Sequence, residues 1–375
     1  MTLKERGLVF AQAAYNNQKR LEKMNPRRAL TFDDVLILPA VSAIESRSTI
    51  NLDTTFLGYN LKLPIISANM DYVTEADMAV AMCDSGGFYV LHRFLSDTKF
   101  TKQVRALASF RYAYTDNKLV PIPISISIGI RDMKYELIRV ADAREIADEE
   151  ITVTIDVAHG HHTKVASLIQ ELKYQGYPRV IAGNVATAAG YQFLMDAGAD
   201  AIKVGIGPGS VCTTREVTGV GVPQLTAIMD CVEAQQAQNG PPIIADGGIK
   251  NSGDIVKALA AGADMVMLGS LLAGTNEAPG EVRVDPQGNR WHPYRGQSIF
   301  GVNETKYTPE GIEGWVKEKG SVSDVLRKLS GGIRSGLSYV GAHNIEELRN
   351  KANFVEVSHA THLESGTRIV EELYS

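Results

Sequence analysis

The sequence is poor in cysteine, and it lacks both long apolar runs and an excess of basic residues. Three cysteines among 375 residues are too few for a disulfide framework, so we expect a protein of the reducing cytoplasm. No apolar run reaches the about 18 residues of a membrane-spanning helix, so no membrane partner is expected. The net charge of −5 disfavours a nucleic-acid partner, which a basic surface would bind. A small phosphorylated ligand stays open, because backbone amides bind phosphate without net positive charge.

Eight short apolar runs recur along the chain, most of them rich in valine and isoleucine, and helix-like segments lie between most of them. Near-continuous apolar runs suit strands that are buried on both faces of a parallel sheet. Eight strands alternating with helices predict an α/β protein, a (β/α)8 TIM barrel. A doubly wound open sheet is the alternative, disfavoured because no GxGxxG follows the first run. The predicted strands are 64–69, 88–92, 122–130, 151–157, 179–184, 200–205, 242–246 and 264–269, and the clearest helices are 163–175, 186–197, 223–237 and 252–261.

The alternation stops after the eighth strand, and it defines the expected domain organisation. Residues 1–30 are predicted to form a polar N-terminal arm, and 31–375 a single catalytic barrel domain. Within it, 274–320 is polar, contains several glycines and prolines, and has no clear period. Long segments of this kind in a compact domain are usually functional, so we expect an extended lid loop over the barrel mouth. A helix is expected at 323–329.

The strongest local motif is GIGPGSVCTTR, which begins at Gly205 directly after the sixth predicted strand. Its alternating glycines allow a sharp turn that brings backbone amides close to an anion. Cys212 in this loop lies where barrel enzymes carry catalytic groups, which suits a nucleophilic thiol. A buried structural cysteine explains the local string equally well. Cys83 and Cys231 lie on apolar helix faces and are predicted to be core residues.

Polar residues also end other predicted strands. Asp246 precedes two glycines after the seventh strand, where barrels often bind phosphate, and it suits ribose hydroxyls; a plain turn is the alternative. Asp156 and Asn184, at the ends of the fourth and fifth strands, suit a nicotinamide cofactor. The histidines that follow Asp156 match no standard zinc spacing, so a metal is the minority interpretation; they are His159, His161 and His162.

Taken in order, these motifs resemble the inosine monophosphate dehydrogenase/guanosine monophosphate reductase family. The similarity runs from about Thr31 to near the C-terminus. It is carried by LTFDDVLILPA, SANMDYVTEADMA, DVAHGH, AGNV, GIGPGSVCTTREVTGVGVPQLTAI, IIADGGI, MVMLGSLLAGT, PYRG and GGIRSGLSYVGA. The resemblance implies a homotetrameric barrel enzyme that acts at C2 of a purine nucleotide with NADPH or NAD. The dehydrogenases usually carry paired cystathionine-β-synthase-type modules after the second strand. Here about thirty residues separate the second and third predicted strands, so we expect those modules to be absent.

The resemblance also assigns roles to single residues. Cys212 resembles the nucleophile that attacks C2, and Thr214 resembles the threonine that positions the attacking or leaving group. Ser210, Gly248 and Ser270 resemble phosphate contacts, and Asp246 a ribose anchor. The same comparison places Ser67, Gly247, Gly269, Tyr294 and Gly296 at the substrate, and Asp156, Ala158 and Asn184 at the cofactor. The carbonyl groups of Gly207, Gly209 and Cys212 match positions that hold a monovalent cation, often K⁺.

Which of the two reactions the chain catalyses depends on the lid. The dehydrogenases use an adjacent Arg-Tyr pair in the lid to activate water, and here only Lys306-Tyr307 is present. Reductases have a short lid and use a Thr-Glu pair. Their glutamate is expected soon after Gly296, where this chain has no acid, so Glu304 or Glu310 would have to serve.

Other motifs divide between the two branches. The sequences NMD at 69–71 and FYVLHR at 88–93 are reductase-like, whereas VTE at 73–75, YRG at 294–296 and PEGIEG at 309–314 are dehydrogenase-like. We favour a GMP reductase, because the missing Arg-Tyr pair removes the hydrolytic step while a displaced glutamate can come from the lid. An IMP dehydrogenase, an atypical C2 chemistry on a related purine nucleotide, and a non-catalytic nucleotide-binding barrel remain the alternatives.

Overall fold

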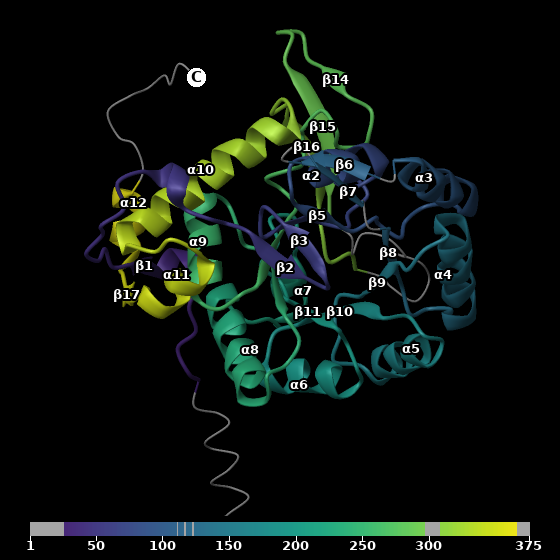
Figure 1. Cartoon of the computed structure of the whole chain (residues 1–375), viewed down its shortest axis with the longest axis horizontal. Helices are drawn as coiled ribbons and strands as arrows, with labels where there is room; N and C mark the ends of the chain where they lie inside the picture. The colour runs from purple at the N-terminus through teal and green to yellow at the C-terminus, as the bar shows by residue number, and fades with distance from the viewer. Residues whose placement is uncertain (1–25, 111, 116–117, 122–123, 297–307, 366–375) are drawn as a thin grey trace, which may run out of the picture.

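The computed structural model describes residues 26–110, 112–115, 118–121, 124–296 and 308–365, and a barrel of eight parallel strands lies at its centre (Figure 1). In spatial order the strands run β5-β4-β13-β12-β11-β10-β9-β8. Beyond β5 and β8 the ring closes through Leu91, which forms a parallel bridge with Ile126 and donates its N–H to Ser125 O at 3.0 Å. The strands are β4 (Ile65–Ser67), β5 (Phe88–Tyr89), β8 (Ser125–Ile128), β9 (Thr152–Asp156), β10 (Arg179–Val185), β11 (Ala201–Val204), β12 (Ile243–Asp246) and β13 (Met265–Leu268). The predicted TIM barrel and all eight predicted strand positions are confirmed.

Each barrel strand is followed by a helix that packs on the outside of the ring (Figure 1). The four clearest predicted helices are present. The helices are α2 (Ala76–Asp84), α3 (Asp97–Ser109), α4 (Met133–Ala147), α5 (Thr163–Tyr174), α6 (Ala188–Asp196), α8 (Gln224–Gln238), α9 (Ser252–Ala260) and α10 (Val322–Val340), with the short α7 (Thr214–Thr218) between β11 and α8. Polar side chains begin most of them; Asn251, for example, accepts a hydrogen bond from Asp254 N at the start of α9.

Helix α10 is longer than the sequence predicts, and its glycines explain the difference. We expected a helix at 323–329, because the glycines that follow disfavour a helix interior. In the structure two of them let α10 approach α9 closely. A Cβ at Gly332 would lie 2.1 Å from Ser252 Oγ, and one at Gly336 would lie 2.7 Å from a methyl carbon of Val256. Close helix packing therefore offsets the weak helix propensity.

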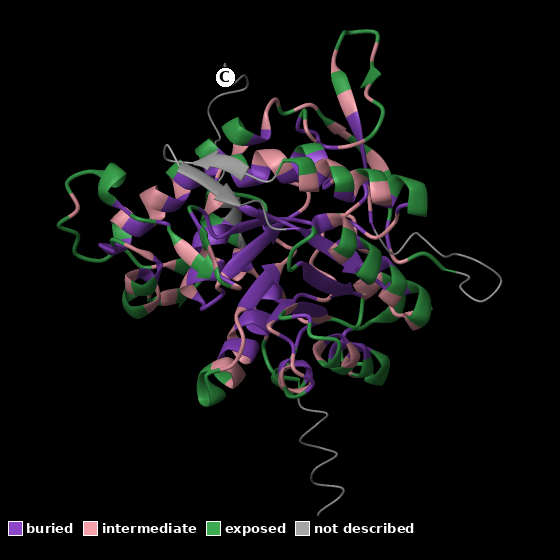
Figure 2. Ribbon diagram, turned by 45° about the vertical axis from the view of Figure 1, so that its right-hand side comes forward, coloured by how far each residue is buried: buried purple, intermediate pink, exposed green. Residues whose placement is uncertain are grey.

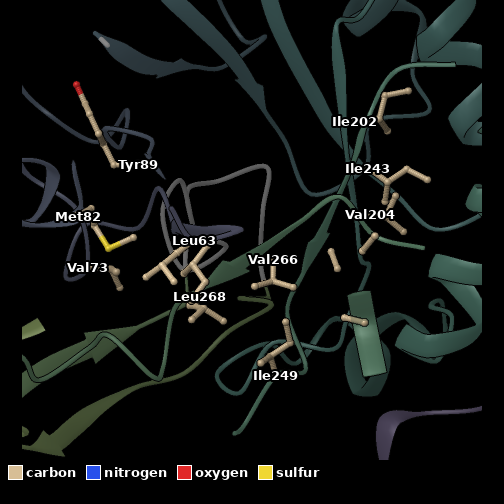
Figure 3. Packing of buried hydrophobic residues seen from close by; sticks show 14 of the residues in the cluster. Leu63, Val73, Met82, Tyr89, Ile202, Val204, Ile243, Ile249, Val266 and Leu268 are labelled. Carbon is tan, nitrogen blue, oxygen red and sulfur yellow. The ribbon is translucent and has the colours of Figure 1, made fainter. Parts of the chain in front are cut away.

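The barrel strands are buried on both faces, with one apolar layer between the strands and the helices and another inside the barrel (Figure 2). Alternate residues of each strand face the helices; Figure 3 shows Ile202 and Val204 of β11 near Ile243 of β12 in this outer layer. The other residues fill the barrel interior, including Ile66, Phe88, Ile181, Ile244 and Met265. Burial of each such side chain stabilises the fold by about 1.5–3 kcal/mol.

A hairpin closes one end of the barrel. Strands β2 (Thr54–Phe56) and β3 (Tyr59–Leu61) pair antiparallel just before β4. Phe56 lies edge-on to Phe88 of the interior with 5.4 Å between ring centroids. Because this end is filled, the accessible end is the one where the strands terminate.

The segment predicted as a lid loop contains a small sheet of its own. Strands β14 (Arg283–Val284), β15 (Arg290–Arg295) and β16 (Glu313–Lys317) form an antiparallel sheet that projects from the barrel (Figure 1). The sequence prediction missed these strands because most of their residues are polar or partly exposed and β15 contains Pro293. The expected lid is therefore a loop only in part.

The remaining elements lie between or beyond the barrel units. The connection from β5 to β8 contains α3 and the hairpin of β6 (Tyr112–Thr115) and β7 (Lys118–Pro121), and β1 (Val35–Ile37) pairs with β17 (Phe354–Glu356) near the other end of the chain. Most of the predicted arm 1–30 lies outside the described residues. Among the residues that are described, no helix is long and apolar enough to cross a bilayer. The short helices are η1 (Phe32–Asp34), η2 (Arg47–Thr49), α11 (Ile345–Lys351) and α12 (His359–Glu364).

Candidate active site

A cavity of about 350 Å³ opens where the barrel strands end. Its wall comes from the segments that follow the barrel strands and from three residues of the lid segment, Tyr294, Gly296 and Glu310. TIM-barrel enzymes carry their active sites at this end of the barrel. The cavity is therefore the candidate active site.

The loop after β11 forms one side of the cavity, and its glycines are required by space as well as by backbone angle. Gly205 has a φ of +150°, and a Cβ there would lie 2.0 Å from Asp246 O. Gly207 has a φ of +86°, and its Cβ would meet the Arg215 side chain at 2.5 Å. These contacts press the loop onto the barrel and place Cys212 in the cavity wall.

Three side chains form a hydrogen-bonded chain at this wall. The Cys212 thiol donates to Thr214 Oγ1 at 3.2 Å, and the Thr214 hydroxyl donates to Glu310 Oε2 at 3.0 Å. A proton can pass along such a chain between the carboxyl group and a group bound beside the sulfur. The chain joins Cys212 and Thr214, which match the family motif, to Glu310, one of the two acids that the sequence left open.

Backbone pairing brings Glu310 to this position. Gly311 forms an antiparallel bridge with Cys212, and Ile312 N donates to Val211 O at 3.0 Å. Thr213 N in turn donates to Glu310 O at 3.3 Å. The part of the lid segment that contains Glu310 is thus held against the loop after β11. The other predicted acid, Glu304, lies outside the described residues.

The three cysteines differ in exposure, and this predicts a labelling pattern. Cys212 is partly exposed, whereas Cys83 and Cys231 are buried. Burial raises the pKa of the Cys231 thiol to about 12 and raises that of Cys83 further. Because the thiolate is the reactive form, a thiol reagent should label one cysteine rapidly in the folded protein, and peptide mass spectrometry should locate it at Cys212. Rapid labelling of either buried cysteine would contradict this structure.

The cavity lining also carries hydroxyls and backbone groups suited to an anion. Gly247 and Gly248 have φ values of +93° and +80°, conformations that favour glycine. The Ser210 and Tyr294 hydroxyls lie 3.4 Å apart, and burial raises the pKa of Tyr294, which keeps it protonated as a donor. Gly269 and Ser270 belong to the same lining.

One predicted substrate residue is placed elsewhere. Ser67 does not line the cavity; it is fully buried in β4, and its hydroxyl accepts a hydrogen bond from the Thr74 hydroxyl at 2.9 Å. Ser67 is therefore not among the residues that line this cavity, and its contact with substrate stays a prediction. The alternation of side chains along a strand explains the difference, because the conformation of the strand end decides which neighbour faces the mouth.

A buried ionic network forms the floor of the cavity. Lys203 Nζ lies 2.8 Å from Asp156 Oδ1 and 3.6 Å from Asp246 Oδ2, and Asn184 Nδ2 donates to Asp246 Oδ2 at 2.9 Å. Burial opposes the ionisation of Asp156, but Lys203 and Arg93 outweigh it and lower its pKa. Burial likewise opposes the charge of Lys203, and the two carboxylates outweigh it and raise its pKa. Asp156 and Lys203 are therefore charged.

The motifs of the sequence did not predict Lys203 as a site residue. A lysine inside an apolar strand is the signal that could have revealed it, because such residues are almost never fully buried without a partner. The sequence analysis also missed Arg93, the last residue of the FYVLHR motif, and Arg131, which line the cavity after β5 and β8.

The residues predicted to bind the cofactor line part of the cavity. Two of them already form hydrogen bonds within the protein. Asp156 pairs with Lys203, and Asn184 donates to Gly205 O as well as to Asp246. Arg93 Nε, however, is buried without a hydrogen-bond partner and lies 3.5 Å from Asp156. Arg93 Nε thus has an ion-pair partner but makes no hydrogen bond, and it is able to donate one to an acceptor on a bound ligand. Val157 and Ala158 add the less polar wall against which a nicotinamide ring would lie.

Two kinds of cation site were considered from the sequence, a metal site made of side chains and a K⁺ site made of carbonyl groups. Among the described residues, no group of three histidine, cysteine, aspartate or glutamate side chains is arranged to hold a metal ion. The K⁺ site predicted from Gly207, Gly209 and Cys212 relies on carbonyl groups instead. Gly209 O already accepts from Cys212 N at 3.1 Å and has a second lone pair for a ligand. The K⁺ site stays a prediction.

The fold and the position of the cavity define the class, a (β/α)8 barrel enzyme. Residues 29–368 match the family model of the IMP dehydrogenase/GMP reductase domain, so the chain belongs to this family, whose members are NAD(P)-dependent oxidoreductases. It is similar to inosine-5'-monophosphate dehydrogenase from Aquifex aeolicus, with 36% identity over 92% of this chain and 96% of that protein. GMP reductase from Leishmania donovani is 32% identical over 92% and 97%.

A solved structure gives the same fold. It is a cysteine-to-alanine variant of GMP reductase from Trypanosoma brucei in complex with guanosine 5'-monophosphate. The TM-score is 0.83 and the sequence identity is 30%, over 93% of this chain and 99% of the other. The relatives thus include both reactions of the family.

Proposed function

We propose that this protein is a GMP reductase, which converts GMP, NADPH and one proton into IMP, ammonia and NADP⁺. The observation that carries the proposal is the hydrogen-bonded chain from Cys212 through Thr214 to Glu310. It supplies the Thr-Glu pair that reductases use, from a glutamate that the sequence alone left open. The similarity to a GMP-bound reductase supports the same substrate.

In this mechanism the Cys212 thiolate adds to C2 of the guanine base. Glu310, acting through Thr214, delivers a proton to the departing amino group, and ammonia leaves. The base is then held as a thioimidate on the sulfur. Bound NADPH supplies the hydride for C2. The C–S bond then breaks, which frees the Cys212 thiolate and releases IMP.

The rest of the cavity holds the nucleotide in place. Ser210, Ser270 and the backbone at Gly248 line the side proposed for the phosphate, and Asp246 lies at the floor where ribose hydroxyls would bind. Asp156, Ala158 and Arg93 line the side proposed for the nicotinamide. Precise placement matters because hydride transfer requires the two reacting atoms within about 3–3.5 Å of each other.

The same thiol, hydroxyl and carboxyl would also serve an IMP dehydrogenase, if Glu310 took a proton from water instead. Most of the similar curated proteins bear that name. Against it stands the lid sequence, which has no adjacent Arg-Tyr pair to activate water. An atypical reaction at C2 of a related purine nucleotide is the third candidate.

One assay separates these reactions. The purified protein is incubated with GMP and NADPH, and separately with IMP and NAD⁺, while the absorbance of the reduced cofactor is followed. We expect NADPH to be consumed with GMP and no NADH to form with IMP. The reverse result would identify a dehydrogenase, and no change in either mixture would point to another nucleotide or to a binding protein.

Substitution of Asp246 by alanine should weaken nucleotide binding. Its carboxylate is the charged acceptor proposed for the ribose hydroxyls, and hydrogen bonds to charged groups contribute enough for a rise in the KM for nucleotide of about ten- to hundredfold. Asp77→Ala, at an exposed position of α2, is the control. Steady-state kinetics measures both, and an unchanged KM in Asp246→Ala would remove this residue from the site.

Three further properties remain proposals. The homotetramer implied by the family is tested by sedimentation of the purified chain. The K⁺ requirement is tested by replacing K⁺ with Na⁺ in the assay. The cytoplasmic location is tested by fractionation of the cells that produce the protein.

A further inference from the structure

Lys203 is a buried cation inside the barrel. It belongs to β11, whose neighbouring residues Ile202 and Val204 point outward into the apolar layer between strands and helices (Figure 3). Since alternate residues of a strand face opposite sides, Lys203 points into the barrel. Only 1% of its surface is exposed.

The ammonium group contacts three other segments of the barrel. Nζ lies 2.8 Å from Asp156 Oδ1 of β9, 3.6 Å from Asp246 Oδ2 of β12 and 3.4 Å from Asn69 Oδ1 after β4. Strand β12 is the immediate neighbour of β11 on one side, and β9 lies two strands away on the other. The two carboxylates therefore approach one ammonium group from both sides of β11.

Both carboxylates also line the cavity, and each continues into a different lining segment. Asp246 continues into Gly247 and Gly248 on the nucleotide side, whereas Asp156 continues into Val157 and Ala158 on the cofactor side. A buried cation shared between buried Asp156 and partly exposed Asp246 fixes their separation, because moving either carboxylate away would leave the charge of Lys203 less well compensated.

We propose that Lys203 is a positioning residue that sets the nucleotide and the cofactor relative to each other by holding Asp246 and Asp156 at once. Lys203 also lines the cavity, but in this role it acts through the two aspartates and not through a contact of its own with either ligand. The inference rests on the proposed function in one respect, since it takes Asp246 as the nucleotide side and Asp156 as the cofactor side.

Three variants of the full chain test this role. Lys203→Met keeps an unbranched side chain and removes the charge. The double variant Asp156→Asn/Lys203→Met removes both charges of the closest pair, so that it folds without an unpaired Asp156. Lys173→Met is the matched control, because Lys173 forms a 2.8 Å ion pair with Asp200 away from the cavity. For each protein, calorimetry gives the Kd for GMP alone, thermal unfolding gives Tm, and kinetics gives kcat and the KM for NADPH.

We expect Lys203→Met to bind GMP about tenfold or more weakly and to raise the KM for NADPH, since both anchors lose their common partner. The double variant should regain most of the lost Tm and still bind GMP weakly, because Asp246 remains without its cation. A purely structural role predicts instead that GMP affinity recovers together with Tm. Lys173→Met should change Tm alone.

The outcomes separate this proposal from the proposed function. Wild-type GMP affinity in the double variant overturns the role of Lys203, even if the wild-type protein reduces GMP. The expected pattern of Kd values in a protein that does not consume NADPH supports the role of Lys203 and overturns the proposed reaction. A wild-type protein that binds neither GMP nor IMP overturns both.

Discussion

Substitution of Cys212 by alanine should abolish turnover and leave nucleotide binding largely intact. Attack at C2 requires the thiolate, and the loss of a nucleophile typically lowers kcat by at least about a thousandfold. Binding should persist because the phosphate and ribose contacts lie elsewhere in the cavity.

The measurements are kcat with GMP and NADPH, and the Kd for GMP by calorimetry. Intact-protein mass spectrometry adds a direct readout, since the wild-type protein mixed with nucleotide should show a covalent adduct at Cys212 and the variant none. Cys231→Ala, in the buried face of α8, is the control for loss of a thiol. Substantial turnover in Cys212→Ala would rule out the covalent mechanism, and tight binding by the wild type without any adduct would favour a binding protein.

Substitution of Glu310 by glutamine should have the second-largest effect. The amide keeps the size of the side chain and the acceptor for the Thr214 hydroxyl, but it cannot supply a proton to the leaving amino group. Loss of a general acid typically lowers kcat by about 10²- to 10⁴-fold. The Kd for GMP should stay close to that of the wild type.

Glu313→Gln is the matched control, because Glu313 lies three residues further along the same segment and is half exposed. Its kcat should equal that of the wild type. A Glu310→Gln protein with nearly unchanged kcat would move the acid to another residue, and Glu304→Gln would then be the next variant to measure.

The barrel was predictable because its strands are buried on both faces. Segments such as 151–157 and 200–205 are almost continuously apolar, and neither a surface strand nor a loop has that composition. The lid strands could not be predicted, because β16 is exposed or only partly buried and β15, although buried in its second half, is interrupted by Pro293 and carries polar residues. For the same reason the length of α10 depended on a contact with α9 that no local pattern contains.

The candidate site was predictable where one motif holds the residues together. Cys212 and Thr214 are two positions apart in one loop, and the structure places both at the cavity. Glu310 could not be chosen over Glu304, because the contact with Thr214 spans 96 residues of sequence. The charge balance around Lys203 depends in the same way on separate strands, so composition alone does not reveal it.

The pairing of β4 with β13 has a consequence for the synthesis of the chain. Ile66 and its partner Met267 are about two hundred residues apart, so one side of β4 has no hydrogen-bonding neighbour until most of the chain has left the ribosome. Such an unpaired strand edge is a template for association with other chains. Nascent chains that stop before Met265 should therefore depend on chaperones, whereas those that extend beyond it can complete the ring unaided.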